Sequence, residues 1–329
     1  MRALRLVSHC FVLAGILTAG ASAALSQSAA TTYPTKAVHF VVPFAPGAST
    51  DLVARLFGQK LSAAWGQPVV VENRGGAGGG IGAEQAARAE PDGYTLMVTN
   101  QGPSILNALL RKTSSYTVAD LAPVIEFGYS PLIVVANPQF PANDMKELVA
   151  FAKANPGKVT IGTSGTNSNP HIALEVLKTV TGTDIVHVPY RGTGPSLNDV
   201  VAGSISGAYT TTVSAEGLIK SGRVKVLGVA GTKRLAVIPD VPTYAEQGIA
   251  GADAAVWIGL VAPARTPKPV VDKINRDANA SLQNADVRER FAQWGLEVEG
   301  GTPERFEVAI KAEVERIARL IKAGALKVE

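Results

Sequence analysis

Short apolar segments alternate with longer segments whose apolar residues recur at helical spacing, and this alternation constrains the fold more than any other feature. Residues 37–43 have the character of a buried strand, and residues 51–65 follow as a helix that Gly66 is expected to end. Strand-like segments recur at residues 159–162 and 185–189, again followed by helical patterns. We therefore expect an α/β fold with mixed, mostly parallel sheets flanked by helices.

The last part of the chain predicts a long amphipathic helix. Thr302 and Pro303 are typical of an N-cap and a first helical position, and Gly324 is expected to close the helix. The residues expected on its apolar face are Phe306, Ile310, Val314, Ile317 and Ile321.

The length of 329 residues suggests two domains, at roughly 150 residues each. No linker rich in Pro, Gly or Ser separates two halves, so we expect one domain to be inserted into the other. We assign residues 33–128 and 236–329 to a first, discontinuous lobe and residues 129–235 to a second lobe. The chain is expected to cross between the lobes near residues 127–131 and 231–235.

Residues 1–23 have the layout of a secretory signal peptide. Two arginines precede an apolar stretch at residues 6–20, and small residues end at Ala23. A membrane anchor is the alternative, but the stretch is short for a span and contains His9. Cleavage would remove Cys10, the only cysteine, and a cysteine-free chain suits an oxidising compartment.

Composition and charge exclude several classes of protein. The formal net charge is +4 without a basic run, so we expect no nucleic-acid partner. One cysteine and four histidines disfavour a disulfide framework and a metal site built on thiolates or histidines. The chain has neither a His-Glu-x-x-His motif nor a Gly-x-Ser-x-Gly elbow. We expect no cofactor, no metal and no enzymatic activity.

Three strand–loop–helix junctions, residues 42–51, 161–171 and 188–196, carry the candidate binding chemistry. Each places small or hydroxyl residues where a strand ends and a helix begins, with Pro170 and Pro195 expected at first helical positions. Free N–H groups and the positive end of the helix dipole gather at such a junction, which can therefore bind an anion. The alternative is that these are ordinary turns with capping residues.

A few side chains near these junctions could contact a ligand directly. Arg191 could pair with a carboxylate, with a surface salt bridge as the alternative. Phe44, Tyr190 and Tyr209 could wall a cleft, or each could belong to a core. His171 opens a helix, where a capping or core role is the alternative.

The glycine-rich run at residues 75–83 partly fits a dinucleotide-binding fingerprint through Gly78, Gly80 and Ala83. No ribose-binding acid follows a second strand, and no Gly-Lys-Ser/Thr ends the loop. We interpret the run as a tight turn with close helix packing.

Six blocks spread over the chain carry a family resemblance. They are Tyr33–Pro34, Pro43–Gly47, Glu72–Gly78, Pro91–Leu96, Val188–Gly192 and Ile238–Thr243. Through them the chain resembles the substrate-binding proteins of tripartite tricarboxylate transporters, also called Bug receptors. The resemblance implies a periplasmic, two-lobed Venus-flytrap fold (type II) that holds a small carboxylate largely through loop backbone groups and ordered waters. It also implies a monomer that works with integral-membrane permease subunits.

Departures from the family pattern bear on the ligand. Ala48 replaces the usual second glycine, Asn100–Gln101 replaces a Gly-Thr-His type sequence, and Ser206 replaces a frequent acid. The missing acid disfavours a ligand ammonium and favours a dicarboxylate. The aromatic candidates hint at an aromatic one such as terephthalate or phthalate, with a tricarboxylate as the alternative.

We therefore expect a periplasmic solute-binding protein that captures a small organic carboxylate between two lobes and delivers it to a membrane permease. The alternatives are a receptor that presents its ligand to a membrane kinase, an exported enzyme on the same fold, and a structural or adhesion protein. The expected ligand-binding residues are Phe44, Ala45, Gly47, Ala48, Ser49, Thr50, Asn100, Gln101, Ser164, Gly165, Thr166, Asn167, Ser168, His171, Tyr190, Arg191, Gly192, Thr193, Tyr209, Thr210 and Thr211.

Overall fold

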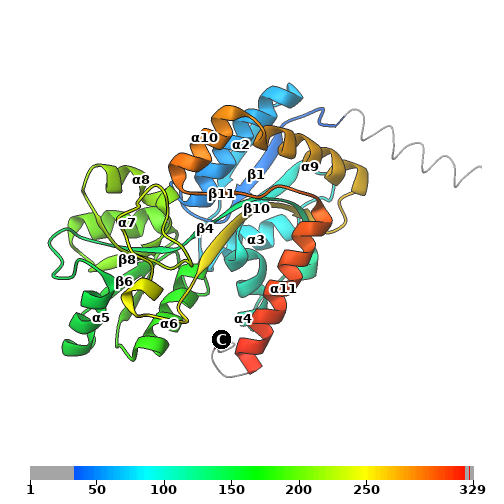
Figure 1. Cartoon of the computed structure of the whole chain (residues 1–329). Coiled ribbons are helices and arrows are strands. Elements are labelled where there is room, and N and C mark those ends of the chain that lie inside the picture. The colour runs from blue at the N-terminus through cyan, green and yellow to red at the C-terminus, as the bar shows by residue number, and fades with distance from the viewer. Residues whose placement is uncertain (1–32, 323–325, 327–329) are drawn as a thin grey trace, which may run out of the picture.

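The predicted alternation of strands and helices is present throughout residues 33–322, which the computed structural model describes together with Leu326 (Figure 1). The signal peptide expected at residues 1–23 and the helix end expected at Gly324 lie outside the described residues. The first lobe contains β1 (Val38–Val42), α2 (Ser49–Trp65), β2 (Val69–Asn73), η1 (Ala77–Gly79), α3 (Gly80–Ala87), β3 (Thr95–Thr99), η2 (Gly102–Leu106), α4 (Asn107–Leu110), η3 (Val118–Asp120), β4 (Leu121–Pro131), β10 (Ala255–Pro263), α9 (Lys268–Leu282), α10 (Ala285–Trp294), β11 (Glu297–Val298) and α11 (Pro303–Lys322). The second lobe contains β5 (Ile133–Ala136), α5 (Met145–Ala154), β6 (Thr160–Thr163), α6 (Asn169–Thr181), β7 (Val186–Pro189), α7 (Thr193–Ala202), β8 (Gly207–Thr210), α8 (Thr212–Lys220), β9 (Lys225–Val229) and η4 (Ala245–Gln247).

Each lobe is built on one mixed sheet. The strand order is β11-β4-β10-β3-β1-β2 in the first lobe and β7-β6-β8-β5-β9 in the second. β1 is parallel to β2 and β3, and β6 is parallel to β7 and β8. The other pairings are antiparallel, because β4, β5 and β10 pass between the lobes instead of returning through a crossover helix. The α/β prediction with mixed sheets is confirmed, but the parallel share is smaller than expected.

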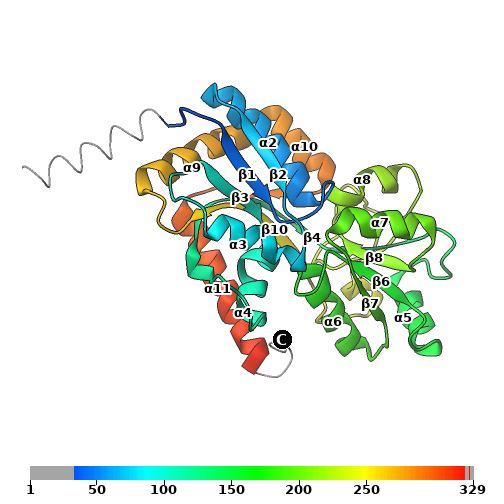
Figure 2. The same ribbon diagram turned by 180° about the vertical axis from the view of Figure 1, so that it is seen from behind.

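The chain crosses between the lobes at two places. β4 ends in the first sheet at Pro131, and β5 begins in the second sheet at Ile133, next to the predicted first crossing. The two views place β4 and β10 where the lobes meet (Figures 1 and 2). The second crossing lies just before Ala255, about twenty residues later than residues 231–235, where we expected it.

The segment between β9 and β10 belongs to the second lobe, contrary to the prediction. Tyr244, Ile249 and Ala252 are buried in the same core cluster as Met145 and Leu148 of α5. The N–H of Ala254 donates to the carbonyl of Ala230 (2.8 Å), which closes this segment back onto β9. It contains little regular structure, so no hydrophobic period in the sequence indicated which sheet it would cover.

Helix α2 shows how the pattern specifies the first lobe. Val53, Phe57 and Leu61, four residues apart, are fully buried, which stabilises the lobe by about 1.5–3 kcal/mol for each side chain. Leu52 and Leu56, one residue away along the helix, are only partly buried and pack at the edge of the same core.

Prolines sit in the first turns of two second-lobe helices. Pro170 is the second residue of α6 and Pro195 the third residue of α7, not the first residue as expected. Proline is tolerated throughout a first turn because N–H groups there have no acceptor within the helix.

In residues 33–322 we find no helix with the length and apolar character required to cross a membrane.

Candidate ligand-binding site

A small cavity lies where the carboxyl ends of strands from both lobes meet. Its volume is about 20 Å³. It is lined by Phe44, Ala48, Ser49, Thr50, Asn100, Leu132, Ser164, Pro170, Thr193, Thr210, Thr211 and Val256. Nine of these residues were expected from the sequence and come from both lobes. Of the three others, Leu132 and Val256 are apolar residues at the two crossings between the lobes, and Pro170 lies in the first turn of α6. The sequence offered no binding signal for any of the three.

The amino-terminal ends of four helices contribute to this cavity. Ser49 and Thr50 begin α2, Pro170 is the second residue of α6, Thr193 begins α7, and Thr211 is the N-cap of α8. The N-caps of α2 and α7 are Ala48 and Gly192, neither of which has a side-chain acceptor for the N–H groups of the first turn. N–H groups and positive dipole ends therefore gather around the cavity, an arrangement suited to an anion.

The hydroxyl of Thr50 lacks a hydrogen-bond partner. Its side chain is fully buried, it lines the cavity, and its Oγ1 has no hydrogen-bond partner among the described residues. Leaving a buried hydroxyl unpaired costs about 1–3 kcal/mol. A bound polar molecule would supply the partner that the protein does not.

No charged side chain lines the cavity in the part of the chain that the structure describes. Six hydroxyl side chains and the amide of Asn100 are its polar groups. An ammonium group would find no carboxylate there, whereas the oxygens of an anion could meet N–H and O–H donors.

Among the described residues, no group of three or more His, Cys, Asp and Glu side chains is placed to hold a metal ion.

Polar side chains around the buried Asp51 fix the loop between β1 and α2. Asp51 accepts hydrogen bonds from the N–H of Gly47 (2.9 Å) and from the amide of Asn73 (2.9 Å). The same Asn73 nitrogen donates to the carbonyl of Phe44 (3.0 Å), and Arg55 pairs with Asp51. Asn73 was not among the predicted site residues, because its role depends on the pairing of β1 with β2. The N–H of Gly47, which we expected to face a ligand, is bound to Asp51 instead.

A second set of predicted residues joins the two lobes by backbone contact. The N–H of Ala45 donates to the carbonyl of Arg191 (3.1 Å). Gly192 has a φ of +142°, and a Cβ there would lie 2.8 Å from the nitrogen of Ala45. The side chain of Arg191 is exposed and does not line the cavity, so the expected pairing with a ligand carboxylate has no support in this geometry.

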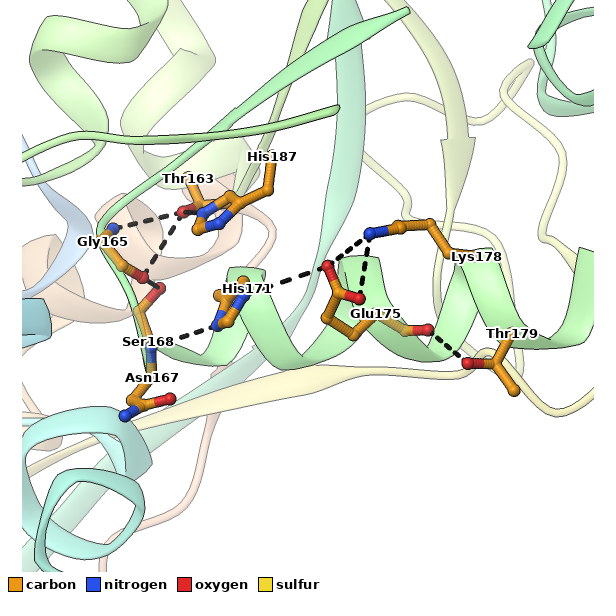
Figure 3. A network of polar contacts seen from close by, with 9 residues as sticks. All are labelled: Thr163, Gly165, Asn167, Ser168, His171, Glu175, Lys178, Thr179 and His187. Atoms are coloured by element: carbon orange, nitrogen blue, oxygen red, sulfur yellow. Dashed lines mark hydrogen bonds and ion pairs between the residues drawn. The ribbon is translucent and has the colours of Figure 1, made fainter. Parts of the chain in front are cut away.

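The loop between β6 and α6 is held by its own hydrogen bonds (Figure 3). Ser168 Oγ donates to the carbonyl of Gly165 (2.6 Å), and the N–H of Asn167 donates to Nδ1 of His171 (3.1 Å). Thr166 is exposed, and its carbonyl lies against Gly78 of the first lobe. Of this loop only Ser164 lines the cavity, so the other predicted residues shape the loop and its contact with the first lobe.

Two histidines stack on each other next to this loop. The rings of His171 and His187 lie 4.1 Å apart at 24°, and Nε2 of His187 is 2.7 Å from Thr163 Oγ1 (Figure 3). Burial, together with the nearby His171 and Lys178, lowers the pKa of His187 to about 4. Because Nδ1 of His171 accepts the N–H of Asn167, the loop conformation requires this nitrogen to be unprotonated.

Three other predicted residues lie outside the cavity. The hydroxyl of Tyr190 donates to Asp199 (2.5 Å), and burial with this hydrogen bond raises the pKa of Tyr190 to about 12. Tyr209 is fully buried in the second-lobe core against Tyr244. The amide of Gln101 contacts the backbone of β10. Of the three aromatic residues expected to wall a cleft, only Phe44 does so, and the hint of an aromatic ligand loses its basis.

The argument from the missing acid at Ser206 is wrong. Ser206 precedes β8, and its hydroxyl accepts a hydrogen bond from the N–H of Thr160 (3.1 Å) at the amino end of the sheet. The cavity lies at the other end of the same strand, at Thr210 and Thr211. An acid at position 206 would therefore not reach a ligand there. The uncharged lining of the cavity supplies the argument against an ammonium ligand instead.

Comparison with known proteins identifies the family. Residues 53–326 match the tripartite tricarboxylate transporter family receptor. The chain belongs to this receptor family. The prediction of a solute-binding receptor instead of an enzyme is thereby confirmed.

Solved structures of other receptors of this type share the whole fold. The periplasmic binding protein BugD is 36% identical, with a TM-score of 0.85, over 90% of this chain and 99% of BugD. Rpa4515 of R. palustris, solved with adipate, is 31% identical, with a TM-score of 0.86, over 90% of this chain and 99% of its own. MatC of Rhodopseudomonas palustris, solved with malate, is 33% identical, with a TM-score of 0.82, over 86% of this chain and 98% of its own. The predicted two-lobed periplasmic-binding-protein fold is confirmed.

Proposed function

We propose that this receptor captures a small organic dicarboxylate between its two lobes. The observation that carries the proposal is the cavity itself: it is lined from both lobes by hydroxyls and first helical turns, and it holds an unpartnered Thr50 hydroxyl. The structures of two receptors with about a third of their residues identical were solved with the dicarboxylates adipate and malate.

One carboxylate is proposed to lie at the start of α2, against Ser49 and Thr50. The other would meet the second lobe at Ser164, Thr193 and Thr211. Each lobe then holds one end of the ligand, so both sets of contacts exist only when the lobes are together. Binding therefore shifts the population toward the closed arrangement.

The volume of the cavity sets a requirement on this mechanism. About 20 Å³ is room for a single water molecule and not for a dicarboxylate. The loops that close it touch through Ala45 and Arg191 and through Gly78 and Thr166. The lobes must therefore separate to admit a ligand, and they must close less tightly around it than they do here.

We further propose that residues 1–23 direct export and are cleaved. The mature receptor would then work in the periplasm as a monomer and pass its ligand to the permease subunits of the transporter. The family's name as a transporter receptor supports this role, as does the description of BugD as a periplasmic binding protein.

A thermal-shift panel on the mature chain tests the ligand class. It contains malate, succinate, adipate, citrate, glutamate, terephthalate, phthalate, benzoate and nicotinate, with calorimetry on every hit. A ligand present at 100 times its Kd stabilises the protein by about 2.7 kcal/mol, which is readily measured. A hit on a dicarboxylate with silent monocarboxylates supports two facing anion sites. A preference for glutamate, or silence across the panel, contradicts the proposal.

A further inference from the structure

Helix α8 has two faces that pack in different lobes. Ala215, Leu218 and Ile219 face the core of the second lobe, to which the helix belongs. Val213 lies on the opposite side, is 2% exposed and is buried in the core cluster of the first lobe. Both views show α8 beside α10, and it contacts α2 as well (Figures 1 and 2). One short helix thus inserts an apolar side chain from one lobe into the other.

Thr212 makes a specific bond in the same place. Its Oγ1 donates to the carbonyl of Trp294 (2.5 Å), the last residue of α10. Terminal carbonyls of a helix have no donor within the helix, so this hydroxyl from the other lobe satisfies one of them. Gly295 has a φ of +66°, and a Cβ there would lie 3.2 Å from Thr212 Oγ1. Glycine at this position therefore allows the close approach.

Glu216, one turn after Thr212, adds a charged contact between the lobes. Its Oε2 accepts from Trp294 Nε1 (3.1 Å) and lies 3.1 Å from Arg290, whose guanidinium stacks over the Trp294 ring at 4.7 Å. Lys220 on the same helix also reaches the carboxylate (2.8 Å). The Glu216 side chain is only 15% exposed, so its hydrogen bonds are screened less than those of a surface pair.

This contact begins one residue after the cavity. Thr211 lines the cavity and caps α8, and Thr212 follows as the first residue of the helix. We infer that α8 couples ligand contact to lobe closure, with Thr212 and Glu216 as positioning residues that do not touch the ligand. The inference rests on the proposed function. Bonds that form only when the lobes are together stabilise the closed, ligand-holding arrangement relative to the open one, so losing them raises the apparent Kd.

The test uses the mature chain and two isosteric variants, Glu216→Gln and Thr212→Val. Glu307→Gln is the control, because Glu307 pairs with Lys311 (2.6 Å) within α11 and lines a pocket made of first-lobe residues. Malate and adipate are titrated by calorimetry, and the radius of gyration is measured by X-ray scattering with and without each. We expect both α8 variants to raise the Kd about tenfold. The radius of gyration at saturation should stay unchanged, as should the Kd of the control.

The outcomes separate the two proposals. If the wild type binds and the α8 variants bind equally well, the coupling role of α8 is overturned while the proposed function stands. If the wild type binds neither probe, the dicarboxylate proposal loses its support, and scattering without ligand decides the role of α8. When neither probe binds, a larger radius of gyration in both α8 variants than in the control supports a role of α8 in lobe closure. Equal radii overturn that role.

Discussion

The backbone N–H of Ala45 donates to the carbonyl oxygen of Arg191 (3.1 Å), so the loop after β1 touches the loop before α7 across the two lobes. Neither side chain takes part in this bond. Gly192 next to it leaves no space for a Cβ. The closed arrangement therefore depends on backbone at this contact, and substitutions there act through shape.

Gly192→Ala is expected to impair closure. A Cβ at this position would lie 2.8 Å from the Ala45 nitrogen and 3.1 Å from its Cβ, at a backbone φ of +142°. The strain of about 1–3 kcal/mol should appear as a roughly 5- to 150-fold rise in the Kd for the dicarboxylate, measured by calorimetry. Gly182→Ala is the control: its φ is also positive (+63°), but no atom lies within 4 Å of the added Cβ. An equal loss of affinity in both variants would show that contact with Ala45 is not the cause.

Thr50→Val is expected to change stability and affinity in opposite directions. The variant removes a buried hydroxyl without a partner, so the unliganded receptor should gain about 1 kcal/mol. It also removes a donor to the ligand carboxylate, which should cost about 1.5 kcal/mol, or roughly tenfold in Kd. Ser214→Ala serves as the control, because Ser214 Oγ is also buried and unpartnered but does not line the cavity. Unchanged affinity in Thr50→Val would remove this hydroxyl from the site.

His187 is expected to make the second lobe sensitive to acid. Its pKa is lowered to about 4 from an ordinary 6.5, so the unfolded chain binds a proton in this interval and the folded chain does not. This contribution to stability is present above pH 6.5 and is lost as the pH falls toward 4. His187→Gln should flatten the fall in Tm over that interval, because glutamine can still bind Thr163 but does not titrate. Parallel Tm profiles for the two proteins would contradict this account.

Glu126 is expected to act in the opposite direction. Burial and the nearby Glu299 raise the pKa of its carboxyl to about 7, against the smaller effect of Arg305. The folded chain therefore holds a proton that the unfolded chain releases, and stability falls as the pH rises from about 4.5 through 7. Relative to wild type, Glu126→Gln should gain stability between these pH values. Urea unfolding at about pH 4.5 and pH 8 measures the difference, and an equal midpoint shift at both would exclude titration of Glu126.

The sequence predicted the positions of strands and helices better than it predicted which distant segments they pack against. Strand and helix periods located β1, α2 and the junctions, because these depend on neighbouring residues. The second crossing before Ala255 and the place of Tyr244 in the second-lobe core depend on packing between distant segments. Family resemblance supplied the two-lobed fold, which the alternation of elements alone left open.

The candidate site was predictable where strand–helix junctions with free backbone N–H groups form it. Hydroxyl residues at strand ends, such as Thr50 and Thr193, were found because the junction pattern specifies their position. Side-chain directions were not predictable: Arg191 points to solvent, and Tyr209 into a core. Val256 joins the site only because β10 passes between the lobes, which no local pattern encodes.

The uncharged lining of the cavity has a consequence for how the receptor responds to its surroundings. None of the described lining side chains gains or loses a proton near neutrality, so the site has no titration of its own there. Its affinity for an acid should follow the ionisation of that acid alone. Exchanges among hydroxyl and small apolar side chains could then change which carboxylate fits while the N–H groups that recognise negative charge remain in place.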